Sequence, residues 1–168
     1  MRMREGDLHV AMRNIFKAKG WTLIAGEFPG GSDHELYPLN VVDPSVAKDN
    51  SPDPRRHSQG ELIPDLVAMK DNVLLIGECK VAYDSDDSQK LLTLLNTRFE
   101  DFTLALEKFA VERKIPELLP VNKFRFIPFQ VFAKGGFPNN LGTHFGFLKV
   151  STYTEGTFFG LLSDENNV

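Results

Sequence analysis

The sequence predicts a fold of the α/β (α+β) class, with helices and strands combined in a single domain. Apolar side chains recur at three- and four-residue steps over residues 4–19, as they do on one face of an amphipathic helix. A second such stripe runs over residues 91–113. Between the two, short apolar runs at 62–69 and 73–81 flank Lys70-Asp71-Asn72, a pattern typical of two strands joined by a tight turn.

Length and composition are those of one globular domain spanning residues 1–168. Of the 168 residues, 42% are hydrophobic and 25% are charged. No apolar run approaches the length of a membrane span, and the first residues lack the apolar core of a signal peptide. The single cysteine excludes an internal disulfide and is typical of a reducing compartment. We therefore expect a cytoplasmic protein with no membrane partner.

The first helix is expected to end at Gly20, a residue that suits a left-handed helix cap. A brief strand should follow at residues 21–25, with Trp21 in the core. The predicted buried stripe of the helix consists of Leu8, Met12, Ile15 and Phe16.

Residues 26–60 show no sustained period, so we expect a long irregular loop there, with a short strand or edge segment at 36–42. The densest positive cluster of this loop contains Arg55 and Arg56. A phosphate contact by these two arginines is one interpretation, and a solvated turn is the one we favour.

The second stripe predicts one long helix that ends near Arg113. The acidic run Asp84, Asp86 and Asp87 precedes it and lacks the central glycine and closing glutamate of an EF-hand, so we interpret it as a helix N-terminus. The buried positions expected along this helix are Leu91, Leu94, Leu95, Phe99, Phe102, Leu106 and Phe109.

The last third of the chain is predicted to contain three strands. The first covers residues 123–134 and is expected to be interrupted or bulged near Pro128. Two more, at 145–150 and 156–162, would pair as a hairpin within a C-terminal β elaboration at 135–168.

Three charged residues interrupt the apolar runs of the central hairpin: Asp65, Glu78 and Lys80. Left unpaired, they would cost several kcal/mol. Because side chains alternate along a strand, Glu78 and Lys80 should share one face while Cys79 points to the other. Two carboxylates converging beside a lysine can hold a divalent cation. The alternative is a salt bridge between Lys80 and one of the acids at a sheet end.

Pro64-Asp65 followed by Glu78-Cys79-Lys80, each on a predicted strand, resembles the motif of the PD-(D/E)XK nuclease superfamily. The resemblance covers roughly residues 4–134, through the order helix, strand, hairpin, helix, strand. It implies a restriction-endonuclease-like core, in which helices flank a central mixed β-sheet. The net charge of −4 does not favour nucleic-acid binding by itself, although such nucleases carry acidic centres.

The resemblance implies a metal-dependent deoxyribonuclease, an endonuclease of a restriction, repair or mobile-element system. Asp65 would anchor Mg²⁺, with Mn²⁺ as a substitute, and Glu78 and the backbone carbonyl of Cys79 would supply further oxygen ligands. Lys80 would position or deprotonate the attacking water, or stabilise charge on the phosphate. DNA is the expected partner, and cutting both strands of a duplex would favour a homodimer. The alternative function is a catalytically silent nuclease-fold protein that binds nucleic acid or a protein partner.

The resemblance also implies further ligands. The helix before the sheet often supplies one more metal ligand, and the spacing to Gly20-Trp21 selects His9, with Glu5 one turn earlier; a surface Glu–His pair without a role is the alternative. A glutamine on the helix after the motif lysine orients the site in exonuclease-like members, and Gln89 matches that position. Lys90 could contact a phosphate or be a solvated lysine.

Overall fold

The computed structural model describes residues 2–29, 36–42, 61–138 and 144–163. Helices in this part of the chain are α1 (Glu5–Ala18), α4 (Ser85–Leu95) and α5 (Phe99–Glu112), with short 3-10 turns at Pro116–Leu118 and Val121–Lys123. The main sheet contains β1 (Thr22–Gly26), β4 (Leu66–Lys70), β5 (Val73–Cys79), β6 (Arg125–Phe132), β7 (Gly146–Val150) and β8 (Gly156–Gly160). Two shorter strands, β2 (Val41–Val42) and β3 (Glu61–Leu62), pair with each other in a separate ribbon.

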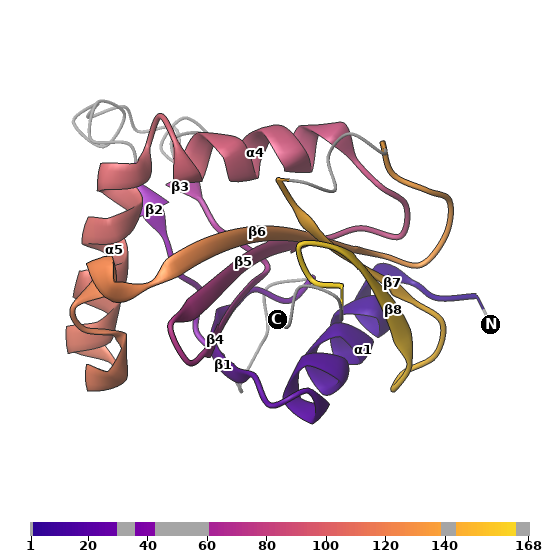
Figure 1. Cartoon of the computed structure of the whole chain (residues 1–168), viewed down its shortest axis with the longest axis horizontal. Coiled ribbons are helices and arrows are strands. Elements are labelled where there is room, and N and C mark those ends of the chain that lie inside the picture. The colour runs from indigo at the N-terminus through magenta and orange to yellow at the C-terminus, as the bar shows by residue number, and fades with distance from the viewer. Residues whose placement is uncertain (1, 30–35, 43–60, 139–143, 164–168) are drawn as a thin grey trace, which may run out of the picture.

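The sheet has six strands in the order β1-β4-β5-β6-β7-β8 and is mixed. Strands β5, β6 and β7 run parallel, whereas the other neighbouring pairs are antiparallel. Helix α1 covers one face, and α4 and α5 cover the other, with an apolar core on each side (Figure 1). The predicted class, a central mixed sheet flanked by helices, is therefore confirmed. Within the described ranges, no helix is long and apolar enough to cross a membrane.

Helix α1 lies inside the predicted range and buries the predicted stripe. Leu8, Met12 and Phe16 are fully buried against the sheet, together with Trp21 just beyond the helix. Gly20 has a φ of +90°, which a residue without a side chain adopts at little cost. The local sequence thus fixes where the helix stops and which face it presents to β5 and β6.

The central hairpin is formed by β4 and β5. Their antiparallel register runs from Leu66 opposite Gly77 to Lys70 opposite Val73, and the turn residue Asp71 has a φ of 52°. The first predicted strand was expected from residue 62, but Leu62 belongs to β3 and β4 begins only at Leu66. Asp65 consequently lies at the entrance of β4 instead of in its interior.

The prediction of one long second helix is wrong, because the chain forms α4 and α5 with a break at residues 96–98. Asn96 leaves helical geometry at φ −122° and ψ −82°, and its side-chain amide donates to the carbonyl of Leu92 at 2.9 Å. Asn and Thr are poorer helix formers than the residues around them. The apolar spacing continues through the break because both helices pack on the same face of the sheet (Figure 1). Next to the break the predicted burial is wrong for Phe99, which is 38% exposed, and Leu95 is only partly buried.

The expected interruption near Pro128 is also wrong. The parallel register between β5 and β6 runs unshifted from Val73 opposite Arg125 to Cys79 opposite Val131. Arg125 and Ala133 donate their backbone N–H groups toward the β5 side, so the nitrogen of Pro128 faces the side of β7. Pairing with β7 begins only at Phe129, and no ladder hydrogen bond is therefore lost.

The other predicted strands are present. Strands β7 and β8 pair as a hairpin, from Gly146 opposite Gly160 to Val150 opposite Gly156. Strand β2 lies within the segment where a short strand was expected, inside the predicted loop. The rest of that loop falls largely on 30–35 and 43–60, outside the described residues.

Gly77 is expected to tolerate no side chain, because a Cβ atom there would overlap the ring of the buried Phe129. Overpacking of this kind costs about 1–3 kcal/mol. We expect Gly77→Ala to lower the free energy of unfolding by about that amount in denaturant titration. Gly136→Ala, where nothing lies within reach of the added methyl group, is the control and should leave the midpoint unchanged.

Candidate active site

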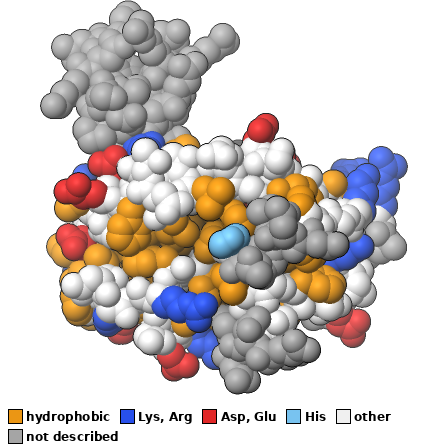
Figure 2. All heavy atoms as spheres, turned by 45° about the horizontal axis from the view of Figure 1, so that its top comes forward, with side chains coloured by type: hydrophobic (Ala, Val, Ile, Leu, Met, Phe, Trp, Pro, Cys, Tyr) orange, Lys and Arg blue, Asp and Glu red, His pale blue; other side chains and the backbone are white. Residues whose placement is uncertain are grey.

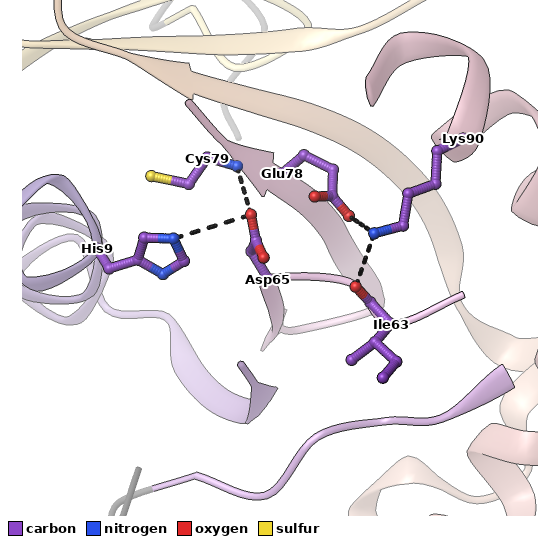
Figure 3. Close-up of polar contacts among 6 residues, drawn as sticks. All are labelled: His9, Ile63, Asp65, Glu78, Cys79 and Lys90. Carbon is purple, nitrogen blue, oxygen red and sulfur yellow. Dashed lines mark hydrogen bonds and ion pairs between the residues drawn. The ribbon is translucent and has the colours of Figure 1, made fainter. Parts of the chain in front are cut away.

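The two acids of the motif meet where β4 begins and β5 ends (Figure 3). Asp65 is fixed to β5 by two hydrogen bonds. Its backbone N–H donates to the carbonyl of Gly77 at 2.9 Å, and its Oδ2 accepts from the backbone N–H of Cys79 at 2.8 Å. Glu78 lies on β5 between these partners and is 4% exposed. The hairpin register therefore places two carboxyl groups side by side.

The pKa values of both carboxyl groups are raised above their ordinary values. Burial raises the pKa of Asp65 from 3.8 to about 6, against hydrogen bonds from Cys79 and Glu78 that lower it. Burial, followed by the negative charge of Asp65, raises the pKa of Glu78 from 4.5 to about 9. Two carboxylates that adjoin, one buried and one partly buried, disfavour each other's charge, so near neutral pH Glu78 holds a proton and Asp65 accepts a hydrogen bond from it.

Lys90 on α4 reaches down to Glu78. Its Nζ lies 2.7 Å from Glu78 Oε1 and also donates to the backbone carbonyl of Ile63 at 2.8 Å. This ammonium lowers the pKa of both acids, but by less than burial raises it. Sequence reasoning placed Lys90 at a phosphate or in solvent, and missed its contact with Glu78. The helical spacing alone gave no signal for it.

Gln130 of β6 fixes α4 over this site. It lies opposite Glu78 in the parallel register, and its Nε2 donates to Ser88 Oγ at 2.8 Å and to the carbonyl of Asp84 at 3.2 Å. Asp84 in turn caps α4 by accepting from the N–H of Asp86 at 2.8 Å, which confirms the interpretation of the acidic run as a helix N-terminus. The only sequence signal for Gln130 was one amide inside an apolar strand.

Of the two candidates on the first helix, His9 is the one in contact with the acids. It is 1% exposed, and its Nε2 lies 3.9 Å from Asp65 Oδ2 (Figure 3). Its ring packs against that of Phe28. Glu5 is exposed one turn earlier, and its charge acts on Cys79 and Lys80. His9 thus stands next to the carboxylate pair, and Glu5 stands at its margin.

Lys80 is exposed just beyond the end of β5. Its pKa is raised, chiefly by the negative charge of Asp87 at the start of α4, so it remains an ammonium at neutral pH. Glu78 faces the α4 side, where Lys90 contacts it, while Cys79 packs in the core beneath α1, so these two neighbours alternate as predicted. Lys80 feels the negative charges of Asp87 on α4 and of Glu5 on α1. Burial raises the pKa of the Cys79 thiol well above its usual value, which leaves this cysteine unreactive.

The acids fit a divalent cation held by two carboxylates and water. Mg²⁺ is usually bound through one or two carboxylates and keeps several waters, and it would offset the mutual repulsion that raises the pKa of Glu78. In the part of the chain that the structure covers, no three His, Cys, Asp or Glu side chains are grouped to hold a metal. A cation here would therefore have Asp65 and Glu78 as its carboxylate ligands and would take other ligands from water.

The other predicted substrate contacts are Gln89, Arg55 and Arg56. Gln89 is exposed on α4, next to Lys90 but on the solvent side. Arg55 and Arg56 lie outside the described residues.

Comparison with protein-family models, with curated proteins and with solved structures finds no match for this chain. Its function is therefore inferred from the residues of the site.

Proposed function

We propose that this protein is a Mg²⁺-dependent nuclease that hydrolyses phosphodiester bonds of DNA. The observation that carries the proposal is a pair of adjoining carboxyl groups, the buried Glu78 and the partly buried Asp65, with Lys80 two residues after Glu78. The order of helix, strand, hairpin, helices and strand around them supports it, since this is the order that the resemblance to PD-(D/E)XK nucleases implies.

In this proposal each residue has a distinct task. A bound divalent cation would supply charge neutralisation at the phosphate and would lower the pKa of a water molecule. Asp65, oriented by the N–H of Cys79, and Glu78 would hold that cation. The negative charge of Asp87 favours the protonated form of Lys80, which suits Lys80 to stabilise negative charge on the phosphate and to orient the attacking water. His9 orients Asp65 from the opposite side.

The proposal includes an endonuclease of a restriction, repair or mobile-element system that acts in the cytoplasm. The single cysteine supports the cytoplasmic location. A homodimer would place two such sites on the two strands of a duplex.

One observation favours a second candidate, a catalytically silent nuclease-fold protein that binds nucleic acid or a protein partner. The Lys90 ammonium lies 2.7 Å from Glu78, where it competes with a cation for the same carboxyl group. If that contact persists in the presence of metal, the site would bind without cutting.

A cleavage assay on plasmid and oligonucleotide DNA separates the two candidates. We expect cutting with Mg²⁺ or Mn²⁺ and none with a chelator, and a rate about a hundred-fold lower for Lys80→Ala, within the range for one proton-transfer or charge-stabilising group. Because Lys80 is exposed, the Lys80→Ala variant should melt at the temperature of the unmodified protein. Lys108→Ala, on the exposed face of α5, is the matched control. Cutting that survives the chelator, or equal rates in the two variants, contradicts the mechanism, and binding without cutting supports the silent candidate.

A further inference from the structure

A second feature of the same sheet end is a pocket lined by positive side chains. It has a volume of about 300 Å³ and lies between the segment that leads into α1 and the chain just beyond β5 and β6. Half of its six lining residues are cationic. The pocket is lined by Arg2, Met3, Arg4, Val81, Ala133 and Lys134.

Backbone hydrogen bonds place this pocket just beyond the ends of β5 and β6, the end of β5 that carries Glu78. Val81 accepts backbone hydrogen bonds from Ala133 at 2.9 Å and from Lys134 at 3.0 Å, which joins the two chain segments at the floor of the pocket. Val81 follows Lys80 directly and comes three residues after Glu78, a distance of roughly 10 Å at the rise of an extended strand. One nucleic-acid strand that crosses this end of the sheet could therefore reach the pocket and the carboxylate pair.

The charges around the pocket favour an anion. Arg2, Arg4 and Lys134 are exposed, and within the described residues none of them forms an ion pair. Asp7 on α1 already accepts hydrogen bonds from the Arg4 N–H at 3.1 Å and from Tyr153 Oη at 2.8 Å. Glu5 is the remaining exposed acid close by, facing Lys80. Figure 2 shows basic side chains gathered at the right-hand margin, the side on which the N-terminal segment enters α1 in Figure 1.

We propose that this pocket binds a backbone phosphate of the nucleic-acid strand on which the carboxylate pair acts, a few nucleotides from the cut bond. This inference rests on the proposed function, because the phosphate belongs to the strand that the nuclease would cut. Arg2 and Arg4 offer planar guanidinium groups suited to two phosphate oxygens, and Lys134 adds a point charge from the opposite wall. The chemical class recognised is a phosphodiester, and no base is read there.

The test measures binding separately from cleavage. A fluorescently labelled DNA oligonucleotide is titrated with the full chain in the presence of a chelator, at several salt concentrations, and anisotropy is recorded. The triple variant Arg2→Gln/Arg4→Gln/Lys134→Gln is compared with a control of equal net charge. That control, Lys108→Gln/Lys114→Gln/Arg125→Gln, removes exposed cations from α5, from the residues after it and from the opposite end of β6.

We expect the pocket variant to bind at least about ten-fold more weakly and the slope of its salt dependence to fall by about 1, since one neutralised phosphate contributes close to one. The control should bind like the unmodified protein, and both variants should melt at its temperature because all six residues are exposed. Equal weakening in both variants, or in neither, overturns the proposal, as does an unmodified protein that binds inorganic phosphate in the pocket but no oligonucleotide.

The two proposals fail differently. Cleavage that is unchanged in the pocket variant, with unchanged binding, overturns the phosphate pocket and leaves the nuclease intact. Pocket-dependent binding by a protein that never cuts overturns the nuclease and supports the pocket.

Discussion

Asp65→Asn is expected to abolish metal-dependent cleavage. The substitution preserves the shape of the side chain and the hydrogen bond from the N–H of Cys79, but removes the charge that holds the cation. Loss of metal-derived charge stabilisation, worth several kcal/mol, corresponds to a rate at least about a thousand-fold lower. The rate is measured on supercoiled plasmid with Mg²⁺ at neutral pH.

The matched control is Asp71→Asn in the turn of the same hairpin. Asp71 is exposed and has a φ of 52°, a conformation that asparagine also tolerates. We expect this variant to cut at the rate of the unmodified protein. An Asp65→Asn variant that retains more than about a tenth of that rate would contradict the assignment of Asp65 as a metal ligand, since a tenfold change is only about 1.4 kcal/mol.

The stability of the metal-free protein is expected to fall as the pH rises. Folding raises the pKa of Asp65 from 3.8 to about 6 and that of Glu78 from 4.5 to about 9. The folded state therefore binds more protons than the unfolded state, and its advantage is complete below pH 4 and lost as the pH rises toward 9. Between these limits the free energy of unfolding should drop by a few kcal/mol, on the order that such shifts imply.

Glu78→Gln tests the origin of this pH dependence. The variant keeps an oxygen acceptor for Lys90 but cannot ionise, so its stability should change less with pH and exceed that of the unmodified protein at pH 8. Glu107→Gln, on the exposed face of α5, should reproduce the unmodified profile. Denaturant titrations with a chelator at a series of pH values measure both. A Glu78→Gln profile as steep as the original would show that other groups carry the dependence.

Most of the fold could be predicted because local patterns and tertiary structure agree. The stripe of α1, the glycine that ends it and the turn at Asp71 all follow from short-range chemistry. The break at Asn96 could not be predicted from periodicity, because α4 and α5 bury stripes of the same spacing on the same sheet face. The position of Pro128 depended on where β7 begins, which is a property of the register and not of the local sequence.

The two acids of the site were predicted from the sequence, but the residues around them were predicted only in part. Asp65 and Glu78 were predicted to converge because charges inside apolar strands need partners, and the hairpin brings them together. Lys90 and Gln130 were not predicted in their observed roles, since each reaches the site across layers from another element. Contacts between a helix and a sheet depend on how the layers pack, and no spacing within one element encodes them.

The most direct test of the central claim is a calorimetric titration of Mg²⁺ or Mn²⁺ at pH 7, repeated in two buffers of different ionisation enthalpy. The claim predicts one binding site whose heat depends on the buffer, because the cation displaces the proton that Glu78 holds at a pKa of about 9. Asp65→Asn should show no such binding. Absence of binding to the unmodified protein, or equal binding to the variant, would contradict the claim that these two carboxyl groups hold a metal.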